Sequence, residues 1–240
     1  MLAKEKEVLY NLLKSAANYE YGYVPEVFGN KDTIEFTDDK LISDDNQKSE
    51  SKNSKLSLDT IKEKVLSCKN CPLYSTRKNI VLGMGVQNPL VLVVGEAPGA
   101  EEDEQGLPFV GPAGQLLDKM LAAINLSRST NCYIANILKC RPPQNRTPKI
   151  EEANACIAYL KAQIHILKPK MILAMGRTAA QTLLDSPEGI NTLRGRFFET
   201  EGITMLATYH PSALLRDPSL KRPAWEDLKV FASELQRRQG

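Results

Sequence analysis

The stretch LVLVVG at Leu90–Gly95 decides the fold class, because it is a continuous apolar, β-branched run as long as a buried parallel strand. Three later stretches also join an apolar run to a polar or turn-forming tip. They are CYIANIL (Cys132–Leu138), KMILAMG (Lys170–Gly176) and ITMLATYH (Ile203–His210). Since helical patterns separate these runs, we expect an α/β domain with three layers, α/β/α, around a central, mostly parallel, four-stranded sheet.

The segments between and around the strands carry helical signals. Apolar residues recur on one face over residues 114–124, and Thr147 followed by Pro148 has the form of the start of a longer helix. Asp59 is the expected cap of a helix that runs into Cys68. The remaining predicted helices cover residues 178–184 and 224–237.

The first 55 residues differ from the rest of the chain in composition. Lys4–Tyr19 places leucines at helical spacing, whereas the stretch from Gly29 to Lys55 is rich in acids, lysines, serines and asparagines. Such a polar stretch buries too little apolar surface to offset the entropy of ordering it. We therefore expect an N-terminal helix, a candidate for binding a protein partner, and a flexible linker over residues 1–55. One globular domain follows over residues 56–240.

Composition and charge set broad limits. A hydrophobic fraction of 42% and a net charge of +2 are ordinary for a globular protein, and the charge neither announces nor excludes a nucleic-acid binder. No apolar run reaches the roughly 18 to 20 residues of a membrane span, and the N-terminus lacks the form of a secretory signal. Five cysteines favour a metal or cluster site in a reducing compartment. We expect a cytoplasmic monomer that does not bind membranes.

Polar or turn-forming residues stand at the carboxyl ends of the predicted strands, where sites form in parallel sheets. The loop GEAPG places Gly95, Glu96 and Ala97 directly behind the first strand, and it is neither a dinucleotide loop nor a P-loop. Asn136 interrupts the second strand with an amide that must find partners, so it either matches the edge of a pyrimidine or caps a turn. His210 ends the fourth strand.

Three further features suit a nucleic-acid ligand. Phe109 stands between turn residues, so it is either a stacking platform for a base or part of the core. Arg141 and Arg146 flank a rigid, proline-containing loop of a kind that contacts phosphates. Small and apolar residues behind the histidine have the character of a wedge into stacked bases. The candidates for DNA contact there are Ser212, Leu214 and Arg216.

Four of the five cysteines form a pattern typical of a metal centre. Cys68 and Cys71 make a C-x-x-C pair in polar surroundings, and the expected fold returns Cys156 beside Cys140. Zinc and an iron–sulfur cluster both accept four thiolates, so both stay open, although the wide spacing of the second pair leans toward a cluster. Cys132 lies within an apolar strand and is expected to be a buried core residue.

Several long motifs follow one another from about Leu56 to about Gln236. They are Cys68-x-x-Cys71-Pro, GEAPGAEED (Gly95–Asp103), GLPFVGPAGQLL (Gly106–Leu117), NILKCRPPQNRTP (Asn136–Pro148), Cys156 and HPSALL (His210–Leu215). In this order they resemble the family 4 uracil-DNA glycosylases, the thermostable-type enzymes that carry a [4Fe-4S] cluster. The resemblance implies a base excision repair enzyme that flips uracil out of single- or double-stranded DNA and hydrolyses its N-glycosidic bond, leaving an abasic site.

The resemblance also implies residue roles. The implied cluster ligands are Cys68, Cys71, Cys140 and Cys156, and the implied pocket residues are Gly95, Glu96, Ala97, Phe109, Asn136 and His210. Phe109 would stack on the flipped base, Asn136 would read its edge, and His210 would donate to the carbonyl where negative charge develops. Glu96 would position water or stabilise the sugar cation. Apart from the resemblance, discrimination against thymine needs bulk where its methyl group would sit, and either Glu102 or Asp103 could provide it.

Two other functions fit parts of the pattern. A small-molecule hydrolase or nucleotide-binding enzyme on the same sheet would carry zinc and act without DNA. A non-catalytic module, either an electron carrier or a protein fused to a polymerase, would carry a redox-active cluster and form no abasic product. The combination of GEAPG, Phe109, Asn136 and His210 argues against both, because an electron carrier needs no base pocket.

Overall fold

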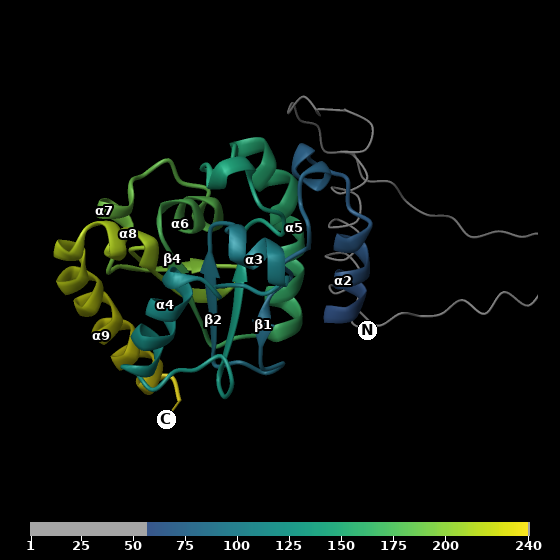
Figure 1. Ribbon diagram of the computed structural model, residues 1–240. Helices are drawn as coiled ribbons and strands as arrows, with labels where there is room; N and C mark the ends of the chain where they lie inside the picture. The colour runs from purple at the N-terminus through teal and green to yellow at the C-terminus, as the bar shows by residue number, and fades with distance from the viewer. Residues whose placement is uncertain (1–56, 240) are drawn as a thin grey trace, which may run out of the picture. The chain divides into compact units, whose positions relative to one another are not determined.

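The computed structural model describes residues 57–239, which fold around a six-stranded sheet in the order β1-β3-β2-β4-β6-β5 (Figure 1). The four central strands run parallel and are the four predicted ones: β3 (Cys132–Asn136), β2 (Val91–Gly95), β4 (Met171–Met175) and β6 (Ile203–Thr208). Two short antiparallel strands, β1 (Met84–Gly85) and β5 (Phe197–Thr200), extend the predicted sheet by one strand at each edge.

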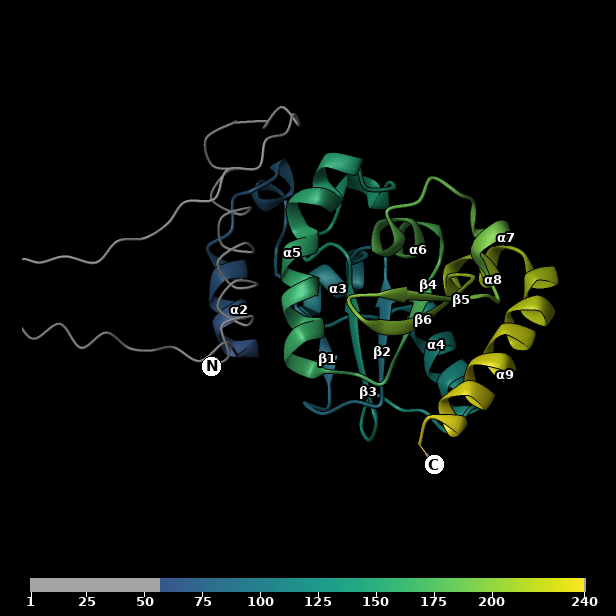
Figure 2. The ribbon, with the colours of Figure 1, turned by 180° about the vertical axis from the view of Figure 1, so that it is seen from behind.

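Helices cover both faces of this sheet, so the predicted three-layer architecture is confirmed. The helices are α2 (Leu58–Leu66), α3 (Ala100–Gln105), α4 (Pro112–Ala122), α5 (Ile150–Leu167), α6 (Arg177–Leu184), α7 (Ile190–Leu193), α8 (Pro211–Arg216) and α9 (Lys221–Arg237). Leu92 and Val94 of β2 pack in the same apolar cluster as residues of α5 and α6, whereas Val91 and Val93 pack with residues of α4 and α9. Figures 1 and 2 accordingly show α5 and α9 on opposite sides of the sheet.

Two predicted helix starts are wrong. Ser57, rather than Asp59, caps α2, because its hydroxyl accepts a hydrogen bond from the amide of Thr60 at 3.2 Å. Helix α5 begins at Ile150 and not at Thr147, because the carboxylate of Glu152 accepts a hydrogen bond from the backbone N–H of Lys149 and closes the helix there.

The strand register brings the predicted functional tips together. Gly95 at the end of β2 pairs with Asn136 at the end of β3, and Met175 of β4 pairs with Thr208 of β6. The loops that follow these four strands therefore leave the sheet at one edge, where ligand sites form in parallel sheets.

The expected helix at Lys4–Tyr19 and the linker up to Lys55 lie outside the described residues. No helix within residues 57–239 is long and apolar enough to cross a membrane.

Candidate active site and cysteine centre

Gly95, Asn136 and Phe109 meet at the carboxyl edge of the sheet. A methyl group on Gly95 would lie 2.4 Å from Oδ1 of Asn136 and 2.5 Å from Cζ of Phe109, far inside contact distance. The absence of a side chain at Gly95 therefore lets the amide and the aromatic ring approach the strand end. Three residues that the sequence predicted to act together are neighbours in the structure.

Asn136 presents an unused hydrogen-bond acceptor. The residue is 2% exposed, and its Oδ1 atom has no hydrogen-bond partner among residues 57–239. Buried polar atoms are almost always paired, and an unpaired acceptor costs about 1–3 kcal/mol. This oxygen is therefore available to an N–H group of a bound ligand.

Two side chains from different segments hold Phe109 in a left-handed backbone conformation, with φ of 53°. The carboxylate of Glu102 accepts hydrogen bonds from the N–H groups of Val110 and Gly111, at 3.0 and 3.1 Å. On the other side, the guanidinium of Arg128 donates to the backbone oxygen of Phe109 at 3.0 Å and to that of Pro108 at 2.9 Å. A strained backbone held by its surroundings is typical of functional sites.

The ring of Phe109 stacks against the ring of His210, with centroids 5.5 Å apart and planes inclined by 30°. His210 directly follows β6 and caps α8. The backbone of Gly176, with φ of 91°, lies so close that a Cβ there would be 2.8 Å from the Cβ of His210. The histidine is thus packed between the end of β4 and the aromatic ring.

The hydrogen bonds of His210 define its tautomer. Its Nδ1 atom accepts a hydrogen bond from the backbone N–H of Ser212 at 3.2 Å and lies 2.8 Å from the hydroxyl of Ser212. Burial, helped by the positive charge of Arg216, lowers the pKa of His210 to about 4, against the opposing influence of Glu102. The ring is therefore neutral at pH 7, and its proton resides on Nε2, which becomes a directed donor.

Glu96 lies directly behind Gly95, half-buried, at the start of the GEAPG loop. Its carboxylate accepts a short hydrogen bond from the hydroxyl of Thr178 in α6, and its backbone oxygen accepts one from the N–H of Leu138 at 3.1 Å. Ala97 packs against the apolar cluster beneath the loop. The acid that the sequence singled out is thus held in a fixed orientation.

The carboxylates of Glu102 and Asp103 both accept hydrogen bonds from the protein backbone. Glu102 also accepts a hydrogen bond from the N–H of Gly99, so its two oxygens join the start of α3 to the Phe109 turn. Asp103 is buried and accepts from the N–H groups of Lys78 and Asn79, at 3.0 and 3.3 Å. The expectation that one of them excludes thymine has no support in these contacts.

Four cysteines come together on the other side of β3, beside α5. Besides burial, the charges of Cys140 and Cys68 raise the pKa of Cys71, and those of Cys140 and Cys71 raise the pKa of Cys156. The four thiols are therefore electrostatic neighbours. Burial raises the pKa of Cys156 to about 12, and burial likewise raises the pKa values of Cys71 and Cys140. Cys132 lies elsewhere, fully buried in the core, as predicted.

Cations flank this cysteine group. Arg77 donates to the sulfur of Cys140 at 3.2 Å, and a second cation, Lys139, is completely buried beside Cys140 and Cys156. Within residues 57–239, no three His, Cys, Asp or Glu side chains are grouped as a single metal ion requires.

The three arginines that the sequence predicts to contact DNA differ in their surroundings and partners within the protein. Arg216 is exposed, and Arg141 donates to the side chain of Asn145 at 2.7 Å. Arg146, in contrast, forms a two-pronged ion pair with the buried carboxylate of Glu152, at 2.8 and 2.6 Å. The ion pair commits the Arg146 guanidinium to anchoring the start of α5.

The burial of Leu214, a predicted DNA contact within the apolar segment behind His210, does not favour its insertion into DNA. Leu214 is 2% exposed and packs with Tyr209 and Ala224, because this face of α8 points into the core. Its neighbour Leu215 is 48% exposed and is the apolar side chain of α8 that is available to a partner. Ser212, the remaining predicted DNA contact, also holds the ring of His210 in place.

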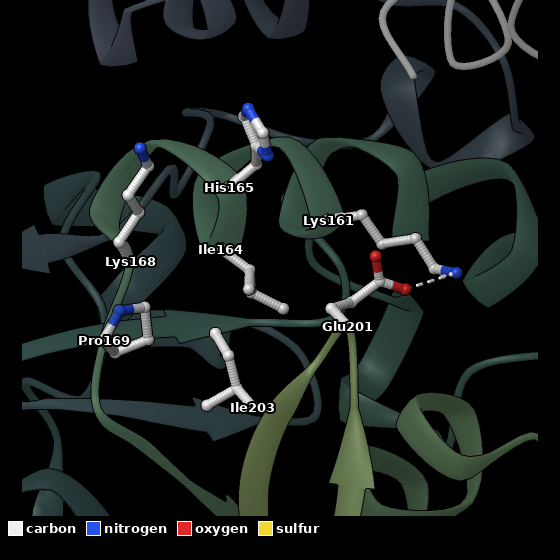
Figure 3. Close-up of a pocket in the computed structure, with 7 residues that line it drawn as sticks. All are labelled: Lys161, Ile164, His165, Lys168, Pro169, Glu201 and Ile203. Atoms are coloured by element: carbon white, nitrogen blue, oxygen red, sulfur yellow. Dashed lines mark ion pairs between the residues drawn. The ribbon is translucent and has the colours of Figure 1, made fainter. Parts of the chain in front are cut away.

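A surface pocket of about 260 Å³ lies away from these residues, between the end of α5 and the turn before β6 (Figure 3). It is lined by Lys161, Ile164, His165, Lys168, Pro169, Glu201 and Ile203, and an ion pair joins Lys161 to Glu201 at 2.9 Å. These residues lie where β4 and β6 begin, at the opposite edge of the sheet from His210. The pocket is therefore separate from the candidate active site.

Comparison with known proteins agrees with this geometry. A family model described as the Uracil DNA glycosylase superfamily matches residues 82–229. A type-4 uracil-DNA glycosylase from Pyrobaculum aerophilum is 42% identical over 73% of this chain and 93% of its own length. One from Thermotoga maritima is 42% identical over the same shares of the two chains. A type-5 uracil-DNA glycosylase from Pyrobaculum aerophilum is less similar, at 29% identity over 65% of this chain and 83% of its own.

Proposed function

The chain belongs to the uracil DNA glycosylase superfamily, and within it to the type-4 uracil-DNA glycosylases, and on this premise we propose that it excises uracil from DNA. The reaction hydrolyses the bond between the base and its deoxyribose and leaves an abasic site for base excision repair. A base inside a duplex is out of reach, so the uracil must first be flipped into the pocket, at a cost of a few kcal/mol. The expected cytoplasmic location is part of this proposal.

The observation that carries the proposal is the free Oδ1 of Asn136 beside Gly95 and Phe109. Uracil has one N–H donor on its Watson–Crick edge, between two carbonyl groups. The Asn136 oxygen matches that donor, and the ring of Phe109 provides a surface for stacking. Cytosine has an acceptor at the same ring position, so it would leave the Asn136 oxygen unpaired.

His210 supplies the main stabilisation of the departing base. Breaking the glycosidic bond leaves positive charge on the sugar and negative charge on the uracil. The Nε2–H of the neutral His210 ring, fixed by Ser212, donates to a uracil carbonyl oxygen as that charge develops. A preorganised donor of this kind contributes on the order of 3 kcal/mol. Glu96, oriented by Thr178, stabilises the sugar cation or positions the attacking water.

Contacts with the DNA strand come from the rim of the same edge. Arg216 and Arg141 serve the phosphates, whose contacts orient the strand without reading its sequence. Among the apolar residues behind His210, the exposed Leu215 of α8 is placed best to act as the wedge into stacked bases. Arg146 acts indirectly, because its ion pair with Glu152 fixes the loop that carries Arg141.

We further propose that Cys68, Cys71, Cys140 and Cys156 hold a [4Fe-4S] cluster. The residues fit the group: four thiols from three segments are electrostatic neighbours, and two cations flank them. When bound, the cluster supplies a structural cross-link and no chemistry on the base. The thiolates tie the 68–71 segment and the end of β3 to α5, and so order the loop over residues 141–146.

The test is a single-turnover assay on a labelled oligonucleotide with one deoxyuridine, followed by alkali to cleave abasic sites. We expect cleavage at the uracil and none at thymine in the same position. His210→Ala should lower the rate by about 100-fold or more, the effect of removing one preorganised donor. Absence of any abasic product from iron-loaded protein would rule out the glycosylase activity. The monomeric state and a protein partner for residues 1–55 remain predictions.

A further inference from the structure

Lys139 is a fully buried lysine that stands in the sequence between two residues with proposed functions. Its side chain is 0% exposed, and it stands in sequence between Asn136, the proposed reader of the base, and Cys140, a proposed cluster ligand. Lysine is among the residues least often buried, because its charge is costly to remove from water. A lysine retained at such a position needs compensating contacts.

Its hydrogen bonds connect the end of β3 to α5. The Nζ atom donates to the backbone oxygen of Asn136 at 2.8 Å and to Oε1 of Gln163 at 2.7 Å. Gln163 is itself fixed, because its Nε2 donates to the backbone oxygen of Leu82 at 2.9 Å. The ammonium therefore holds the very peptide group from which the Asn136 side chain projects.

Both acceptors of Lys139 are neutral, so they satisfy its N–H groups without cancelling its charge. Burial is the largest influence and lowers the pKa of Lys139 to about 8, whereas Cys156 and Cys140, in their thiolate form, oppose this and favour the charged ammonium. A buried cation and a group of buried thiolates each carry a large desolvation cost, and each relieves that of the other. Arg77 reaches Cys140 from a partly exposed position, whereas Lys139 lies wholly in the interior.

We propose that Lys139 is a positioning residue with two linked tasks. Its ammonium offsets part of the negative charge of the thiolate-bound cluster, and its hydrogen bond to the Asn136 carbonyl holds the end of β3 in the position that the base pocket requires. This inference rests on the proposed iron–sulfur cluster and extends it, because it makes the cluster and the base pocket share one buried charge.

The experiment compares two lysine-to-methionine variants of the full chain in iron-loaded form. Lys139→Met keeps an unbranched side chain that is one heavy atom shorter and removes its charge, and Lys170→Met removes an exposed lysine at the opposite edge of the sheet. Two measurements are made: one gives the rate at which iron is released to a chelator, and the other gives the single-turnover excision rate with the DNA concentration at half its maximum.

Lys139→Met should release iron at least about tenfold faster than the unsubstituted protein, because the buried thiolates lose their counter-charge. Its maximal excision rate should fall by about tenfold, while the half-saturating DNA concentration stays within about twofold, because the rim contacts are untouched. Lys170→Met should match the unsubstituted protein in both measurements. Unchanged iron release and excision in Lys139→Met would overturn the proposal.

Gln163→Glu provides a second test if Lys139→Met does not fold. It retains the lysine but places a carboxylate on its ammonium, so iron release should accelerate; an unchanged release rate would overturn the proposal. Purified protein that never binds iron would overturn the cluster and this inference together. Protein that holds iron but excises no uracil would refute the activity alone, and iron release would still decide the role of Lys139.

Discussion

The His210 ring has a fixed hydrogen-bonding direction before any substrate arrives. Ser212 occupies its Nδ1 atom, and burial keeps the ring neutral near pH 7. A donor that is already oriented needs no rearrangement when charge appears on the base, and this is the source of its effect. Protonation would place a second N–H against the N–H of Ser212 and disrupt the cap of α8.

The excision rate should therefore show no titration at the ordinary histidine pKa of 6.5. Because the folded-state pKa is lowered to about 4, the rate should stay within about twofold from pH 8 to pH 6 and fall only as the pH approaches 4. The neutral ring also stabilises the fold above pH 6.5, and that contribution is lost as the pH falls from 6.5 toward 4. Single-turnover rates and denaturant unfolding across this range test both statements. An inflection in the rate near pH 6.5, absent from His210→Ala, would contradict them.

Among the elements, the start of α4 and the Phe109 turn depend on one another. Gly114 lies in the first turn of α4, and a Cβ there would be 1.9 Å from the backbone oxygen of Phe109. That oxygen also accepts a hydrogen bond from Arg128. The turn that presents the aromatic ring is thus fitted directly against the helix.

Gly114→Ala should lower the free energy of unfolding by about 1–3 kcal/mol, because the helix and the turn must separate. The excision rate should fall with it, since Phe109 would lose its position. The matched control is Gly189→Ala, where the new methyl group meets nothing within 4 Å; its effect on both quantities should be much smaller. Thermal unfolding and single-turnover assays measure the difference, and equal effects in the two variants would refute the steric argument.

The sequence predicted the four central strands because their apolar runs are long and continuous. It missed β1 and β5, because β1 has only two residues and β5 has four, of which one is buried. The faces of α8 could not be assigned either: Leu214 and Leu215 are chemically alike, and only the packing of α8 against Tyr209 and Ala224 distinguishes them.

In the candidate site, too, some features were predictable from the sequence pattern and others depend on packing in space. The residues at the strand tips were predictable, because parallel strands place their carboxyl ends together. Lys139 was missed because a lysine in a sequence reads as a surface residue, and only its neighbours in space, Gln163 and the cysteines, give it a buried role. The ion pair of Arg146 with Glu152 could not be predicted either, because the two side chains meet only when α5 has formed.

For the domain as a whole, the proposed cluster is a cross-link between parts that lie far apart in the sequence. Cys68 and Cys71 precede the sheet, Cys140 follows β3, and Cys156 lies in α5. Joining such segments restricts the unfolded chain, as a disulfide does. The cross-link should therefore contribute to the stability of the entire domain and not only of the loop beside it.

Cys156→Ala should lose bound iron and lower the free energy of unfolding by about 2–5 kcal/mol, in the range of a lost covalent cross-link. Cys132→Ala is the matched control, because Cys132 is also buried but packs in the other apolar cluster. It should keep its full iron content and show only the smaller cost of a shortened core side chain. Iron analysis with thermal unfolding distinguishes the two, and full iron content in Cys156→Ala would contradict the assignment of ligands.

The unpartnered oxygen of Asn136 is a point of local frustration in an otherwise well-satisfied core. Without a ligand, the fold tolerates a defect that an apolar residue would remove, and the base that supplies the missing donor relieves it. Selection for a sturdier core and selection for a discriminating pocket therefore act in opposite directions on this one atom. A lineage that maximised stability alone would replace the asparagine, and would keep the architecture while losing the ability to recognise its base.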